Sequence, residues 1–292
     1  MISLFRKNLY NKRSAKKLGW VPLWFGAEKF DEVLILKITD FQHRYDLEPD
    51  GLCGPTTHRR LLTERDAARN PMRSHIICDG EPIEIDWDRV VNLNDSGSLV
   101  LPKNCYRSSL RPDPSMIVTH FDVCLSAESC KRVLEKRGIS SHFVIDNDGT
   151  IYQMVDTAYE AWHAGNRLWN RKSIGVDLSN AIYLKYQKTY VARGHGARPV
   201  IKNLKVHGGT IKECLGFYDV QIEAYKALIA CLCEKYKIPL ECPVDDAGDT
   251  LMKVSAEAER GKFSGVVSHY HLTRRKWDTA NLNLVKVLKE IQ

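Results

Sequence analysis

The N-terminal part of the chain has the apolar spacing of a helical domain. Between residues 28 and 47, apolar side chains recur every three or four positions, which predicts an amphipathic helix. A turn-forming segment follows at residues 49–57, and residues 57–67 predict a second, short helix. Gly51 and Gly54 suit the turn, and Pro55 suits the first turn of the helix that follows. We therefore predict a small all-α domain over residues 1–68.

From Ser74 onward, short apolar runs typical of strands alternate with segments of helical periodicity, the latter at residues 130–138, 219–237 and 279–291. Strands interleaved with helices indicate an α/β domain. We place this domain at residues 81–292, after a linker at 69–80. The strand-like runs are HIIC, PIEIDW, RVVNL, SLVL, MIVTHF, SHFVIDNDGTIYQMV and KSIGVDLSNAIYL.

Two further segments have distinct local signals. Asn147, Asp148 and Gly149 stand between two strand-like runs and predict a β-hairpin turn. The stretch from Thr189 to Thr210 is rich in glycine and basic residues and predicts a long loop.

Composition and charge exclude some classes of protein. Hydrophobic residues make up 43% and charged residues 27% of the 292 residues, which fits a folded chain and argues against disorder. The formal charge of +7 suggests an anionic partner, whether nucleic acid, a membrane surface or an acidic polymer. No helix-turn-helix, zinc-finger or aromatic RNA-binding motif is present, so we expect no nucleic-acid partner. We expect a monomer.

No apolar run is long enough for a membrane-spanning helix, and the N-terminal segment lacks the features of a signal peptide. These features predict cytoplasmic synthesis. Nine cysteines, an odd number without a CxxC pair, do not suggest a disulfide framework or a zinc ribbon.

Polar residues that can bind metal stand at the ends of three apolar strand-like runs. His120 and Asp122 follow one run, Asp177 lies inside a second, and the third is followed by His269, His271, Lys276 and Asp278. Two imidazoles and a carboxylate are a sufficient ligand set for a catalytic zinc ion, which keeps one position open. A further carboxylate beside the ion could act as a general base.

The first domain resembles the three-helix peptidoglycan-binding domain in its segment FQHRYDLEPDGLCGPTTHRRL, residues 41–61. The shared pattern is a Phe-Gln pair, a Tyr-x-Leu, an Asp-Gly turn and a Gly-Pro-x-Thr helix start. This resemblance implies peptidoglycan as a partner and suggests Phe41, Tyr45 and Asp50 as wall-binding residues.

The second domain resembles the zinc-dependent N-acetylmuramoyl-L-alanine amidases, a family that includes phage endolysins and peptidoglycan recognition proteins. The resemblance rests on IVTHFD, SSHFVIDNDGTIYQ, EAWHAGN with SIGVDLSN, and VVSHYHLTRRKWD, which occur in the family's order. It implies a mixed central sheet flanked by helices and a bound Zn²⁺.

Carried over by position, the resemblance implies zinc ligands His120, His269 and Asp278. It implies Asp177 as the general base, in a place where the family usually has glutamate, and Lys276 as the cation that faces the substrate carbonyl. His163 and Trp162 are expected at the substrate groove.

Three alternatives stay open at this stage. His271 competes with His269 as a ligand, because both would point to one side of an extended strand. His142 either reaches the substrate or makes a hydrogen bond inside the sheet. Cys124 and Cys130 have the spacing of a disulfide found in animal relatives, or they are two free thiols.

The resemblance implies hydrolysis of the amide between N-acetylmuramic acid and the first L-alanine of the stem peptide. An enzyme of this kind, made in the cytoplasm without a signal peptide, is expected to be a phage endolysin that reaches the wall from the host periplasm after release. The alternatives are a non-catalytic peptidoglycan-binding or recognition protein, and a secreted bacterial amidase effector.

Overall fold

The computed structural model describes residues 3–69 and 74–291 and divides the chain into two compact units. The first unit contains residues 1–71 and 185–198, and the second contains residues 72–184 and 199–292. The segment 185–198 thus belongs with the N-terminal residues, although the sequence predicted it as part of the second domain. None of the helices within the described ranges combines the length and the apolar character that a bilayer crossing requires.

The first unit is helical and packs around a small aromatic core. Its helices are α1 (Leu4–Leu18), the 3₁₀ helix η1 (Pro22–Phe25), α2 (Glu32–Arg44), α3 (Pro55–Arg69) and α6 (Gln187–Ala192). Asp31 begins α2 because its carboxylate accepts a hydrogen bond from the backbone N–H of Leu34. The side chain of Asn11, on α1, bonds to the backbone of Gly51 and Cys53. Helix α1, which is rich in Lys and Arg, is therefore packed into this unit.

The second unit is built on a mixed six-stranded sheet in the order β12-β5-β9-β6-β7-β3. Only the β6–β7 pair is antiparallel, and the predicted turn containing Gly149 connects these two strands. The strands are β3 (Val90–Val91), β5 (Met116–Phe121), β6 (Phe143–Ile145), β7 (Ile151–Gln153), β9 (Ser173–Leu178) and β12 (Gly265–Ser268).

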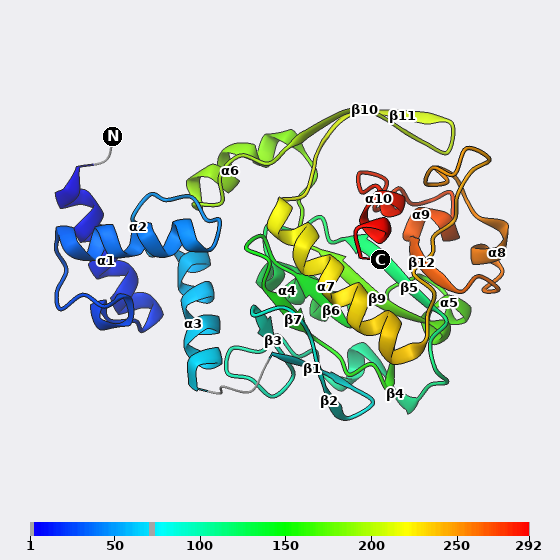
Figure 1. Ribbon diagram of the computed structural model, residues 1–292, viewed down its shortest axis with the longest axis horizontal. Coiled ribbons are helices and arrows are strands. Elements are labelled where there is room, and N and C mark those ends of the chain that lie inside the picture. The colour runs from blue at the N-terminus through cyan, green and yellow to red at the C-terminus, as the bar shows by residue number, and fades with distance from the viewer. Residues whose placement is uncertain (1–2, 70–73, 292) are drawn as a thin grey trace. The chain divides into compact units, whose positions relative to one another are not determined.

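Helices cover both faces of this sheet. The long helix α7 (Asp219–Tyr236) crosses one face, where it shares the main apolar core with the sheet and with α10 (Leu284–Lys289) (Figure 1). The opposite face packs against α4 (Ala127–Arg137) and against the short α8 (Ala256–Glu259) and α9 (His269–Leu272). Helix α5 (Arg167–Lys172) immediately precedes β9. The α/β class with a mixed, helix-flanked sheet is confirmed.

Three two-stranded sheets complete the unit. Two of them are β1 (His75–Cys78) with β2 (Glu81–Glu84), and β4 (Tyr106–Leu110) with β8 (Tyr159–Ala161). The third is the hairpin of β10 (Val200–Val206) and β11 (Gly209–Leu215), which lies in the stretch predicted as a loop. The loop prediction was wrong because most side chains of this hairpin are solvent-exposed, so its strands carry no continuous apolar pattern.

Candidate active site

The floor of the candidate site is formed by two neighbouring parallel strands, β5 and β9. His120 and Asp177 are register partners on these strands. The hydroxyl of Thr119 meets the hydroxyl of Tyr225 on α7, 2.6 Å away. Because successive side chains of a strand point to opposite faces, His120 and Asp177 lie on the face away from α7.

The third strand brings the other predicted ligands to the same place. β12 runs parallel to β5, with Ser268 beside Thr119, and the chain turns into α9 at His269. The chain then returns so that the backbone carbonyl of Asp278 accepts a hydrogen bond from the N–H of Tyr270 at 3.0 Å. Residues more than 140 positions apart in sequence thus meet at one edge of the sheet.

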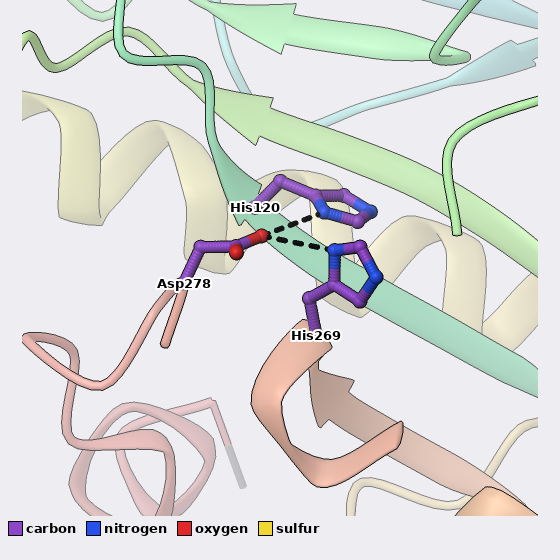
Figure 2. A group of neighbouring side chains, drawn as sticks. All are labelled: His120, His269 and Asp278. Carbon is purple, nitrogen blue, oxygen red and sulfur yellow. Dashed lines mark hydrogen bonds and ion pairs between the residues drawn. The ribbon is translucent and has the colours of Figure 1, made fainter. Parts of the chain in front are cut away.

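His120, His269 and Asp278 form one buried cluster, shown in Figure 2. The Nδ1 atoms of His120 and His269 lie 3.0 and 3.1 Å from the same carboxylate oxygen, Oδ2 of Asp278. One potential ligand atom from each residue lies within 4.8 Å of the others. Figure 2 shows that the three side chains converge from separate segments.

This cluster fits a zinc ion in both chemistry and spacing. Zinc–nitrogen and zinc–oxygen bonds of about 2.1 Å in a tetrahedral site place neighbouring ligand atoms about 3.4 Å apart. The observed separations lie close to this value, so the same atoms could share an ion after small adjustments. The three side chains supply two imidazole nitrogens and a carboxylate, the donor set that catalytic zinc sites use.

The electrostatics of the two site carboxyls differ. Burial alone raises the pKa of Asp278, but hydrogen bonds from His120 and His269 outweigh it and hold that pKa well below its ordinary value. For Asp177, burial dominates and raises the pKa to about 7, although the charges of His269 and Lys276 oppose the rise. Asp278 is therefore a permanent anion, whereas Asp177 can exchange a proton near neutral pH.

Lys276 differs from the other predicted site residues because its side chain is exposed. It follows α9 and precedes Asp278 by two residues. The backbone carbonyl of Lys276 lies 2.9 Å from Nε2 of His207 in the β10–β11 turn. Its positive charge lowers the pKa of both Asp177 and His269, so it acts on the cluster electrostatically.

The structure separates the two histidines that the sequence left as alternatives. His271 Nδ1 accepts a hydrogen bond from the N–H of Ser268 at 3.0 Å, and its Nε2 lies 2.7 Å from the carbonyl of Leu251. Both ring nitrogens are therefore used inside the fold. His269 and His271 point in different directions because the chain turns into a helix at His269 instead of continuing as a strand.

His142 is fully buried, and of its two alternative roles the structure shows the hydrogen bonds inside the sheet rather than a substrate contact. Its Nδ1 accepts a hydrogen bond from the N–H of Gly175 at 2.9 Å, and its Nε2–H donates to the carbonyl of Tyr159 at 3.0 Å. No ring nitrogen is left for a ligand. Burial is the main reason that the pKa of His142 falls to about 3.

His163 and Trp162 lie in the loop after β8 and are half-buried, and His163 contacts the cluster. Nδ1 of His163 is 3.0 Å from Nε2 of His120, a contact that sequence reasoning did not predict. Burial and the neighbouring histidines hold the pKa of His163 well below its ordinary value, so the ring is neutral. The available signal was Gly175, which stands two residues before Asp177 on the same face of β9 and leaves room for this ring.

The expected wall-binding residues of the first unit do not form a surface. Phe41 and Tyr45 are buried in its aromatic core, with 4% and 8% of their area exposed. Asp50 shapes the turn: its Oδ1 accepts hydrogen bonds from the amide of Gln42 and the N–H of Leu52, each at 2.8 Å. For Phe41 and Tyr45 the interpretation as wall contacts is wrong, because aromatic side chains at helical spacing were needed for the core.

Cys124 and Cys130 are not joined by a disulfide in this structure. Contact with Cys124 and burial both raise the pKa of the Cys130 thiol well above its ordinary value. The other seven cysteines, all within the described ranges, form no disulfide either.

The part of the chain that contains this site matches a known protein family. Residues 110–281, more than half of the chain, match the family described as N-acetylmuramoyl-L-alanine amidase. One curated relative, the Rickettsia conorii protein RC0497, is assigned by its name to the N-acetylmuramoyl-L-alanine amidases. It is 34% identical over 74 residues, which are 23% of this chain and only 28% of that relative's length.

Among solved structures, the catalytic domain of XlyA is 19% identical, covers 67% of this chain and 97% of its own, and has a TM-score of 0.41. The amidase LysC from Clostridium intestinale is 16% identical, with coverages of 69% and 96% and a TM-score of 0.39. Residues 110–281, which match the family, include β5, β9 and β12 and every residue of the buried cluster. The chain belongs to the N-acetylmuramoyl-L-alanine amidase family.

Proposed function

We propose that this protein is a zinc-dependent amidase that hydrolyses the bond between N-acetylmuramic acid and the L-alanine of the peptidoglycan stem peptide. The observation that carries the proposal is the convergence of His120, His269 and Asp278 beside a buried carboxyl, Asp177. Membership of the amidase family supports the same reaction. The family match does not by itself define the metal, so zinc rests on the donor set.

His120 and His269 would hold the ion through Nδ1, and Asp278 would hold it through a carboxylate oxygen. A zinc ion there supplies Lewis acidity, which polarises the scissile carbonyl and makes water a better nucleophile near neutral pH. The permanent charge of Asp278 offsets part of the charge that the ion brings into this buried place.

Asp177 is proposed as the general base and acid. Its carboxyl, with a pKa of about 7, accepts a proton from the attacking water and returns one to the leaving amine. The water oxygen becomes bonded to the carbonyl carbon, the carbon–nitrogen bond breaks, and the stem peptide leaves with a free amino group on its L-alanine. Lys276 is proposed to stabilise the negative charge that develops on the carbonyl oxygen.

We further propose that the protein is an endolysin, with the helical unit holding the wall while the second unit cuts it. The support is the resemblance of residues 41–61 to peptidoglycan-binding domains and the charge of +7, which favours an anionic envelope. In this role the enzyme acts on the wall after release from the cytoplasm, from the host periplasm.

Mass spectrometry of purified peptidoglycan digested with the zinc-loaded full chain tests the reaction. The expected product has a new amino-terminal L-alanine and an intact glycan. His120→Ala should abolish both zinc binding and this product, while His43→Ala, an exposed histidine of α2, serves as the matched control. Glycan cleavage or the absence of any product would refute the proposed amide hydrolysis. Full activity of the chelated, metal-free chain would refute the role of zinc. A chain that binds the wall without cleaving it would be a recognition protein.

A further inference from the structure

His163 stands at the start of a continuous chain of hydrogen bonds that leads away from the buried cluster. Its Nδ1 lies 3.0 Å from Nε2 of His120, and its Nε2 lies 3.2 Å from Oγ of Ser173. The Ser173 hydroxyl in turn donates to the backbone carbonyl of Trp169 at 2.7 Å. This series of hydrogen bonds thus begins at His120, a candidate metal ligand, and ends at the backbone carbonyl of Trp169, which can only accept.

The last bond fixes the direction of the others. Because the hydroxyl hydrogen of Ser173 points to the carbonyl, its oxygen accepts from the Nε2–H of His163. Nε2 therefore carries the ring proton of His163, and its Nδ1 accepts a hydrogen bond from the Nε2–H of His120. Nδ1 of His120 faces Oδ2 of Asp278, and this nitrogen would bind the ion once the proton it gives to the carboxylate is lost.

Packing holds the His163 ring in the position that this bond requires. The ring lies against Gly175 of β9, where an added Cβ would be only 2.6 Å from Cγ of His163. The rings of His163 and His120 meet edge to face, with centroids 5.2 Å apart and planes at 81°. The position of the His163 ring is therefore fixed by its contact with Gly175 and by hydrogen bonds to His120 and Ser173.

We propose that His163 is a positioning residue that holds His120 in the Nε2–H tautomer and aims its Nδ1 at the metal. The inference rests on the proposed zinc site and assigns His163 a role different from the substrate contact expected from sequence. Partners that bond the outer nitrogen of a metal-binding histidine fix its tautomer and orientation, and their loss typically weakens metal binding about 10- to 100-fold.

Zinc affinity of the full chain, measured by competition with a chromophoric chelator, tests this role without any assay of activity. His163→Leu removes the acceptor and should weaken zinc binding about 10- to 100-fold. His163→Asn places an amide oxygen near the position of Nδ1 and should recover most of the affinity. The matched control is His195→Leu, which removes a buried histidine of the other unit whose Nε2 lies 2.8 Å from the Thr56 hydroxyl. This control should bind zinc like the native chain.

The outcomes separate this inference from the proposed function. If the native chain binds no zinc, both fail. If it binds zinc and folded His163→Leu binds it equally well, only the role of His163 is overturned. Equal losses in the Leu and Asn variants would also overturn it, because packing rather than the acceptor would then matter. If His163→Leu does not fold, Ser173→Ala decides: it keeps the ring but removes the acceptor of its Nε2–H. Weaker zinc binding then supports the chain of hydrogen bonds, and native affinity refutes it.

Discussion

His142 is expected to make the folded state sensitive to acid. Its Nδ1 accepts from the N–H of Gly175, so a second ring proton would point at another donor. The side chain is fully buried, and the positive charge of Arg111 adds to the cost of protonation. These causes bring the pKa of His142 to about 3, against an ordinary value of 6.5.

The sign and size of the effect follow from proton linkage. A histidine whose pKa is lowered by folding contributes stability above its unfolded pKa and loses it as the pH falls. Between pH 6.5 and pH 4 the unfolded chain takes up the proton while folded His142 does not. Each pH unit in this window lowers the free energy of unfolding by about 1.4 kcal/mol, which gives about 3 kcal/mol by pH 4.

The measurement is urea unfolding of the full, metal-free chain in chelator from pH 7 to pH 4, compared with His142→Gln. The variant should be less stable at pH 7, because buried hydrogen bonds are lost, but its stability should fall about 3 kcal/mol less between the two pH values. All other titrating groups are common to both proteins and cancel in the difference. If the two curves remain parallel, His142 does not stay neutral in the fold and the reasoning is refuted.

Four further substitutions have distinct expected outcomes. Gly175→Ala should displace the His163 ring, cost about 1–3 kcal/mol of stability by overpacking, and weaken zinc binding in a chelator competition. Asp278→Ala should lose zinc and activity together, whereas Asp177→Asn should keep zinc and lose at least about 100-fold in turnover, checked by metal analysis and peptidoglycan digestion. Phe41→Ala should unfold the helical unit by removing about 3–5 kcal/mol of core packing, so that circular dichroism and wall binding decline together. Native helicity in that variant would contradict the core assignment.

Much of the fold follows from sequence where an element packs against the core. The helix α7 and the β6–β7 turn carried clear periodicity and turn residues, and both are present. The β10–β11 hairpin was missed because its stability comes from strand pairing rather than from an apolar face. The run at residues 98–101 is apolar but forms no strand in the described chain, since local composition does not specify a pairing partner.

Those residues of the candidate site that stand at the ends of neighbouring parallel strands could be predicted from the sequence. His120 and His269 follow apolar strands, and parallel neighbours bring the ends of such strands to one edge. The roles of His142 and His271 could not be read from sequence, because their hydrogen-bond partners include the carbonyls of Tyr159 and Leu251, which come from other parts of the chain. Which histidines are structural is decided by distant backbone groups and not by the residues beside them.

The alternation of β9 explains how one short strand serves both stability and chemistry. Its even-numbered side chains, Ile174, Val176 and Leu178, are buried in the core that α7 covers. The odd-numbered positions face the candidate site: Ser173 bonds His163, Gly175 makes room for its ring, and Asp177 supplies the buried carboxyl. The two sets of side chains point to opposite faces of the sheet. Large-to-small changes at the even positions should therefore lower the stability of the fold. A change at Ser173 should weaken metal binding, and a change at Asp177 should lower turnover. Gly175 is the exception among the odd positions, because a side chain there would both displace the His163 ring and lower the stability of the fold.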